Sequence, residues 1–231
     1  MTWYEELGYK VNPLSIKPRL LIIGQNNLYK QLFLQIKKGG VIVLVGEYGS
    51  GKTAMLKKIK KALKVSVPVS FHSHNSGRLR LHEVLTKGFW IFKHKPKNQI
   101  LLLDEVEHLA SWDKNQIINA INQGYIKTVV LASMSKERLG FEKKDGFEIC
   151  TFELKQLNSK ESIELIRARM GNNYLSDEII KKIRKVNPNT RTFLENCETV
   201  CRHAHSLKKN LVDKDDLEVL GSDRRGKLTH I

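Results

Sequence analysis

Residues 46–53 read Gly-Glu-Tyr-Gly-Ser-Gly-Lys-Thr, and this run decides the fold. It fits the pattern G-x-x-x-x-G-K-[ST] of a phosphate-binding P-loop. The unbroken aliphatic run at 41–45 comes before it and predicts a buried parallel strand. Residues 54–59 come after it and predict a helix. The pattern requires a strand before the loop and a helix after it, so the context supports the motif.

The residue types in this run match the chemistry of holding phosphates. Glycine at 46, 49 and 51 permits backbone angles that a Cβ would oppose, so successive amides can turn toward an anion. Lys52 would place its ammonium against the β and γ phosphates, and Thr53 would offer its hydroxyl to Mg²⁺. A glycine-rich turn that binds nothing is the alternative, and the flanking strand and helix argue against it. The residues expected to bind ATP are Gly46, Glu47, Tyr48, Gly49, Ser50, Gly51, Lys52, Thr53 and Ala54.

A second motif follows about fifty residues later. The apolar run at 99–103 ends in Asp104 and Glu105. Because parallel strands deliver their carboxyl ends to one edge of the sheet, Asp104 is expected beside Thr53, where both would hold Mg²⁺. Glu105 would polarise the attacking water. The alternative is a strand that ends in a solvated turn.

The remaining pattern predicts the architecture. Strands are expected at 66–71, 127–133 and 147–152, alternating with helices, which favours a doubly wound parallel sheet. Pro68 suggests an edge position for its strand. After residue 154 only capped helices are expected, so the fold class is an α/β P-loop core followed by a small all-α lid domain. We expect a lead-in at 1–40 that packs on the core, the α/β domain at 41–153, the lid at 154–220 and a basic tail at 221–231.

The composition limits the partners and the cellular compartment that can be expected for the protein. The 231 residues carry a formal net charge of +16, which is usual for a protein that meets nucleic acid. The lysine cluster at 57–61 is also consistent with a merely solvated helix face. No apolar run reaches the length of a membrane span and residues 1–6 do not resemble a signal peptide, so a cytoplasmic protein is expected, or one of the host cytoplasm if viral.

The cysteines and histidines leave one further alternative open. Three cysteines are too few for a disulfide framework and indicate a reducing compartment. Cys197 and Cys201, which are followed closely by His203 and His205, could bind a metal. The favoured interpretation is that the two cysteines lie one turn apart on the packed side of a helix. The histidines at 72 and 74 are interpreted as loop residues.

The order of P-loop, apolar strand with Asp-Glu, polar strand end and helical lid resembles the AAA+ ATPases. Within them it is similar to the origin-recognition/DnaA clade and to archaeal and viral ExeA-like ATPases, as are residues 4–9 with 12–13. The resemblance implies that Ser133 is sensor 1 at the γ-phosphate (the strand pattern alone leaves Ser133 or Ser135 open). It implies that Arg191, within the sensor 2-like run 187–191, reaches the nucleotide; the alternative, a surface arginine at a helix start, is less favoured because its charge opposes the helix dipole. Arg138 is the arginine-finger candidate for a neighbouring subunit, with a solvated arginine as its alternative.

The resemblance implies an enzyme that hydrolyses ATP, completed by homo-oligomerisation or by other AAA+ subunits. We expect it to act in a DNA transaction, either replication initiation or loading of a partner onto DNA. The residues after the lid are too few for a helix-turn-helix domain, so DNA contacts would be non-specific. The alternative is an ATP-switched protein-interaction module, or a secretion or adaptor ATPase without direct DNA contact. The basic residues expected to touch DNA are Arg78, Arg80, Lys87, Arg224, Arg225 and Lys227.

Overall fold

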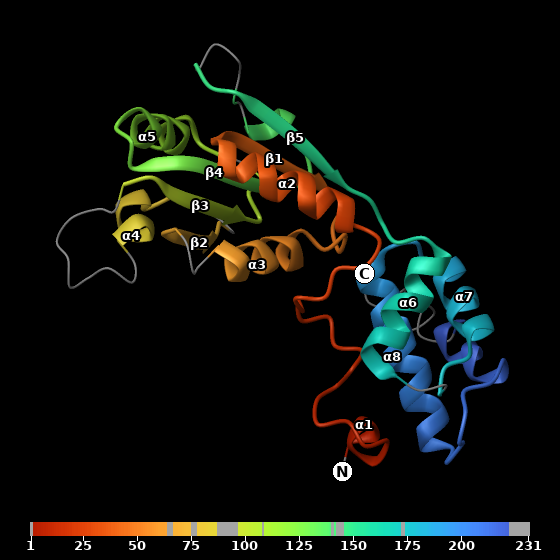
Figure 1. Ribbon diagram of the computed structural model, residues 1–231. Helices are drawn as coiled ribbons and strands as arrows, with labels where there is room; N and C mark the ends of the chain where they lie inside the picture. Colours follow the sequence, from red (N-terminus) through yellow and green to blue (C-terminus); the bar gives the residue numbers. More distant parts are fainter. Residues whose placement is uncertain are drawn as a thin grey trace. The chain divides into compact units, whose positions relative to one another are not determined.

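The computed structural model describes residues 2–63, 67–74, 78–86, 97–107, 109–139, 141, 146–171 and 174–221 (Figure 1). The chain divides into two compact units. One is Pro18–Lys155, and the other joins Met1–Lys17 to Gln156–Ile231. Each unit has its own core and is described separately. The domain boundaries expected from the sequence stay predictions.

A five-stranded parallel sheet forms the centre of the first unit. Its strands are β1 (Gly40–Gly46), β2 (Val69–Ser73), β3 (Gln99–Asp104), β4 (Ile126–Ser133) and β5 (Ile149–Leu154), in the spatial order β2-β3-β4-β1-β5. Every neighbouring pair is parallel, so the predicted α/β class with a parallel sheet is confirmed. Strand β2 lies at an edge, as Pro68 suggested. It extends two residues beyond the predicted end, because His72 and Ser73 pair with Leu103 and Asp104.

Helices cover both faces of this sheet (Figure 1). Helices α2 (Asn26–Lys38) and α3 (Lys52–Leu63) lie on one face, and α4 (Leu81–Thr86), α5 (Ser111–Asn122) and the short η1 (Glu137–Leu139) pack on the other. Successive residues of β1 alternate between the two faces of the sheet. Val41 and Val43 pack on the side of α4 and α5, and Ile42 and Leu44 pack on the side of α2 and α3. This double burial explains why the strands are continuously apolar.

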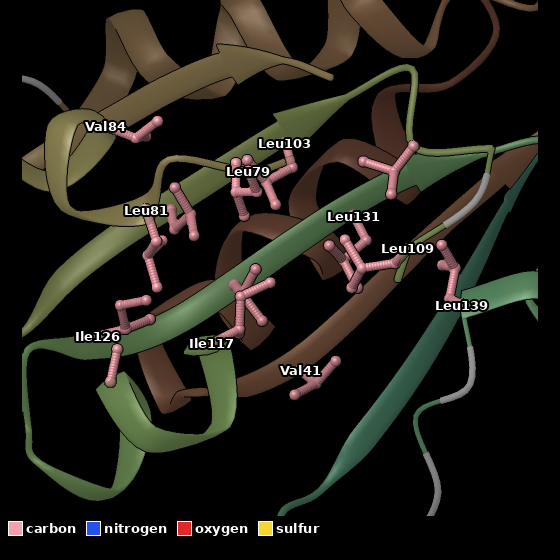
Figure 2. Packing of buried hydrophobic residues seen from close by; sticks show 14 of the residues in the cluster. Val41, Leu79, Leu81, Val84, Leu103, Leu109, Ile117, Ile126, Leu131 and Leu139 are labelled. Carbon is pink, nitrogen blue, oxygen red and sulfur yellow. The ribbon is translucent and has the colours of Figure 1, made fainter. Parts of the chain in front are cut away.

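Figure 2 shows the core on the α4 and α5 side of the sheet. Leu103 and Leu131 from the central strands lie near Ile117 of α5 and Leu79, which precedes α4. All four are buried. The sequence predicts a helix over residues 78–92; in the structure helix α4 begins at Leu81, three residues later, and residue 92 lies outside the described residues. The layered packing fixes the carboxyl ends of β1, β3 and β4 at one edge of the sheet.

The second unit is helical, as expected for the part of the chain after residue 154. It contains α1 (Trp3–Glu6), α6 (Ser159–Met170), α7 (Asp177–Val186), α8 (Thr190–Ser206) and η3 (Asp215–Glu218). The side chains of Asn158, Ser176 and Asn189 accept backbone N–H groups at the starts of α6, α7 and α8, so these three helices are capped, as expected for this part of the chain. Among the described residues, no helix combines the length and apolar character that crossing a membrane requires.

A buried arginine helps to hold this helical unit together. Arg184 donates to the carbonyl oxygen of Leu157, and its guanidinium carbon lies 5.6 Å from the ring centroid of Phe193. Burial lowers the pKa of Arg184, and the charge of Glu161 opposes that shift. The Tyr9 hydroxyl donates to the Met170 carbonyl oxygen over 2.7 Å, which ties the first residues to the helices.

Candidate functional site

The glycine-rich loop connects β1 to α3. Gly49 and Gly51 have φ values of 77° and 101°, a region that side chains with a Cβ rarely adopt. A Cβ on Gly46 would lie 2.5 Å from the Ser50 hydroxyl oxygen. That oxygen is buried and has no hydrogen-bond partner among the described residues. The loop is therefore a tight turn with an unsatisfied polar atom, a feature that a polar ligand such as a phosphate would explain.

Lys52 is the first residue of α3, and its side chain folds over the loop. The Nζ atom donates to the carbonyl oxygens of Gly46 at 2.5 Å and Glu47 at 3.1 Å. Burial lowers the pKa of Lys52, and the negative charges of Glu107, Asp104 and Glu105 oppose this effect. The ammonium therefore lies within the field of three carboxylates at the end of the loop. Ala54 follows in the first turn of α3, and Tyr48 is exposed.

Asp104 and Thr53 are brought together across the sheet edge. Asp104 ends β3 and is only 2% exposed. Burial raises its pKa, a hydrogen bond with the Thr53 side chain counteracts this, and the charge of Glu105 raises it further. A hydroxyl and a carboxylate joined in this way supply the hard oxygen ligands that Mg²⁺ prefers. The two side chains expected to hold the metal therefore lie at one place.

Glu105 occupies an unusual backbone conformation directly after β3. Its φ is 58°, in the left-handed region, and its side chain is exposed. The Ser73 hydroxyl donates to Glu105 Oε2 over 2.5 Å. Ser73 lies opposite Asp104 in the β2–β3 register. The sequence pattern ends this strand at residue 71 and therefore does not predict Ser73 at the site. A polar residue at the carboxyl end of the strand beside Asp104 is the signal that would have found it.

Ser133 lies at the same edge, at the end of β4. It is fully buried and pairs with Val45 of β1 in the sheet register. Its hydroxyl donates to the Ser135 carbonyl oxygen over 2.8 Å and accepts the Ser135 N–H at 3.2 Å. Glu107 Oε2 accepts the Met134 N–H at 3.1 Å, which connects the loop after β3 to the end of β4. Glu107 was also missed, although it is a third acid in the same short segment.

The two arginines expected to complete the site have separate places in the structure. Arg191 lies in the first turn of α8, in the helical unit, where its Nε is 3.3 Å from Glu195 Oε1. Arg138 belongs to η1, and its side chain lies outside the described residues. The roles of both arginines stay predictions.

Several other sequence predictions find their place on the structure. Arg78 and Arg80 are exposed, with the Arg78 guanidinium carbon 5.2 Å from the Trp112 ring centroid. Lys87 and the basic residues of the tail lie outside the described residues. Cys197 and Cys201 are free and fully buried on α8, and no group of three or more His, Cys, Asp or Glu in the described part of the chain could hold a metal ion.

Comparison with known proteins gives one family and a set of similar folds. A family model described as an AAA domain matches residues 38–157. The RuvB Holliday junction branch migration motor of Thermotoga maritima is similar at 20% identity and a TM-score of 0.67, covering 87% of this chain and 70% of RuvB. A search of curated protein sequences found no match.

Two further solved structures have the same fold. Cdc6p from Pyrobaculum aerophilum is 14% identical with a TM-score of 0.64, covering 89% of this chain and 68% of Cdc6p. Domain III of the Thermotoga maritima replication initiation protein DnaA is 15% identical with a TM-score of 0.63, covering 93% of this chain and 98% of that domain. At these identities the likeness concerns the fold.

Proposed function

Because the chain belongs to the AAA domain family, we propose that it binds ATP with Mg²⁺ at the loop before α3 and hydrolyses it. The observation that carries this proposal is the glycine turn before α3, where Lys52 donates to two loop carbonyl oxygens and the buried Ser50 hydroxyl has no partner among the described residues, with the buried carboxylate of Asp104 at the end of β3. A hydroxyl, a carboxylate and a lysine converge there at the carboxyl edge of a parallel sheet, where such sheets bind ligands.

Each residue has a role that its position allows. The amides of residues 47–52 and the start of α3 would hold the phosphates, and Lys52 would turn its ammonium from the loop carbonyls to them. Thr53 and Asp104 would hold Mg²⁺, which when bound neutralises charge on the phosphate oxygens. Glu105 would accept a proton from the attacking water, with its carboxylate fixed by Ser73. Ser133, Arg191 and Arg138 would contact phosphate oxygens in their expected roles.

The variant Glu105→Gln tests the hydrolytic step. We expect the wild-type protein to release phosphate from ATP only when Mg²⁺ is present. Glu105→Gln should bind a fluorescent ATP analogue as tightly as wild type and turn over at least about 100-fold more slowly, the usual contribution of a general base. Glu148→Gln, which removes an exposed acid just before β5, is the matched control and should match wild type. If wild type and Glu105→Gln bind ATP but are equally inert, the protein is an ATP-operated switch instead.

We further propose that this ATP cycle serves a DNA transaction, namely replication initiation or the loading of a partner onto DNA. The net charge of +16 supports it, and two proteins of similar fold are a Holliday junction branch migration motor and a domain of a replication initiation protein. Fluorescence anisotropy with duplex and single-stranded DNA, at 50 to 250 mM salt and with ATP present, tests direct contact. Absence of binding at the lowest salt would reject it.

The expected assembly of several subunits has its own test. Light scattering with and without a non-hydrolysable ATP analogue should show a larger particle when the analogue is bound. The expectation follows from the arginine-finger role proposed for Arg138, which requires a neighbouring subunit. A particle of monomer mass under all conditions, including with DNA, would contradict both the assembly and that role.

A further inference from the structure

Helices α2 and α3 present a surface that carries one sign of charge. They cover the same face of the sheet (Figure 1) and have three lysines on α2 and four on α3 besides Lys52, but no Asp or Glu. We call these seven side chains the lysine face. Its members are Lys30, Lys37, Lys38, Lys57, Lys58, Lys60 and Lys61.

This charge pattern differs from that of the helical unit, where the signs are mixed. Helix α8 pairs Arg202 with Glu198 at 2.9 Å, and the segment after it pairs Lys209 with Asp213 at 2.8 Å. On α3, by contrast, Lys57 and Lys61 are one turn apart with like charge, an arrangement that destabilises a helix. Stability alone therefore does not explain the lysine face, whereas an anionic partner does.

Aromatic rings beneath the lysines hold three of the ammonium groups in place. Lys58 Nζ of α3 lies 4.8 Å from the ring centroid of Tyr29 on α2, which links the two helices. Lys37 lies 4.9 Å from the Phe33 centroid, and Lys60 lies 5.3 Å from that of Phe71 on β2. Such contacts restrict flexible side chains before a ligand arrives, so less entropy is lost on binding.

The apolar sides of the two helices decide which anionic partner fits. A helix that binds a membrane surface inserts its apolar side into the lipid. Here those sides are already used, because Leu32 and Ile36 of α2 and Met55 and Ile59 of α3 are fully buried against the sheet. Leu34 is the exposed large apolar residue on these helices. The surface therefore suits a hydrated polyanion.

We infer that the lysine face binds the phosphate backbone of nucleic acid. This inference rests on the proposed DNA role and gives it a location, different from the arginines and tail expected from the sequence. Lysine ammonium groups are point charges that contact phosphates without reading bases, so binding here is independent of sequence and sensitive to salt. Because α3 begins at Lys52, a backbone bound on its outer side lies on the same helix that holds the nucleotide loop.

The test compares two triple variants of the full chain. Lys30→Gln/Lys57→Gln/Lys61→Gln removes charge from the lysine face and leaves the three ring contacts intact. The matched control removes the same charge from exposed positions of α7: Lys181→Gln/Lys182→Gln/Lys185→Gln. Binding to a 30-base-pair duplex of arbitrary sequence is measured by anisotropy from 50 to 250 mM KCl. Circular dichroism and ATP-analogue binding establish that each variant folds. If the triple variant does not fold, the single variants Lys30→Gln and Lys61→Gln replace it in the binding assay.

The expected result is a selective loss of affinity. The lysine-face variant should bind the duplex at least about tenfold more weakly at 100 mM salt, and its log–log salt slope should fall by up to about 2.7, from roughly 0.9 per lost phosphate contact. The α7 control should stay within about threefold of wild type. Equal effects of the two variants would overturn the inference and leave the DNA role standing. Failure of wild type to bind DNA would overturn both, as would binding only to phosphatidylserine vesicles.

Discussion

The substitution Asp104→Asn should make the protein more stable and less able to use Mg²⁺. Asp104 is 2% exposed, so its charge is almost fully removed from water. Asparagine has nearly the same shape and keeps a carbonyl oxygen for the Glu105 N–H, which Asp104 Oδ1 accepts at 3.1 Å. The main change is therefore the loss of a buried negative charge. Because burial raises the pKa of Asp104, the folded state pays to ionise this group at neutral pH.

The dependence on pH follows from the direction of that shift. The pKa of Asp104 in the folded state lies above its ordinary value of 3.8. Below 3.8 both folded and unfolded chains carry the proton, and the aspartate has no cost. As the pH rises through the interval between 3.8 and the raised pKa, wild type loses stability relative to the asparagine variant. The advantage of Asp104→Asn is therefore largest above the raised pKa and shrinks as the pH approaches 3.8.

The size of the effect can be set against the stabilisation by ligand. A gain on the order of 1 kcal/mol, the common scale for single substitutions, raises the Tm by about 2–4 °C for a chain of this size. Nucleotide at 100 times its Kd stabilises wild type by about 2.7 kcal/mol, or roughly 5–10 °C. Asp104→Asn should lose the part of this stabilisation by nucleotide that depends on Mg²⁺. The variant is then the more stable protein without nucleotide, and it becomes the less stable one with nucleotide and Mg²⁺ when the lost part exceeds about 1 kcal/mol.

Thermal and urea unfolding of wild type and Asp104→Asn at pH 7.5, 5.0 and 4.0 measures the difference in stability between the two proteins. Each is measured alone, with ATP analogue and EDTA, and with ATP analogue and Mg²⁺. Two results would refute the reasoning. A variant less stable than wild type without nucleotide would mean that the Lys52 charge outweighs burial of the carboxylate. An undiminished response to Mg²⁺ would mean that Asp104 does not hold the metal.

Three further predictions concern the loop, α8 and the cysteines. Gly46→Ala places a Cβ 2.5 Å from Ser50 Oγ and 3.0 Å from Leu154, so urea unfolding should show a loss of about 1–3 kcal/mol together with weaker ATP binding, whereas Gly221→Ala, which meets open space, should change neither. Arg191→Ala removes a partly exposed side chain that pairs with Glu195, so its Tm should stay within about 2 °C while turnover falls at least about tenfold. Arg202→Ala, which breaks the similar pair with Glu198, should leave turnover unchanged. Cys197 and Cys201 are fully buried whereas Cys150 is partly exposed, so a thiol reagent should modify only Cys150 in the folded protein and all three cysteines in urea. Rapid reaction of all three in the folded protein would show that α8 is not packed as described.

Local sequence patterns were sufficient to predict the architecture. Runs such as 41–45 and 99–103 form strands that are covered on both faces of the sheet, so nearly every residue in them is apolar. The caps Asn158, Ser176 and Asn189 act within three residues of their own positions. The P-loop depends on glycines that must adopt positive φ inside one turn. In each case the physical cause lies within a few residues of the pattern.

The sequence patterns did not predict which other residues the site residues contact, because those contacts join residues far apart in the sequence. Ser73 meets Glu105 across 32 residues of chain, and only the register of β2 against β3 brings the two together. The left-handed backbone of Glu105 has no signal in its residue type, because a glutamate there is held by its surroundings rather than favoured by them. Glu107 reaches Met134 through a loop whose path depends on β4 lying next to β3.

The lysine cluster at 57–61 shows why these distant contacts matter for function. By sequence alone it is compatible with a solvated helix face, and charge spacing cannot decide otherwise. In the structure Tyr29 of α2 lies beneath Lys58, so a second helix without any acid borders the first. Two short basic runs separated in the sequence thereby become one surface, and a single surface with several ordered ammonium groups can neutralise consecutive phosphates where a lone helix would contact few. The salt slope of DNA binding measures how many charges act together, and is therefore the observable most sensitive to this arrangement.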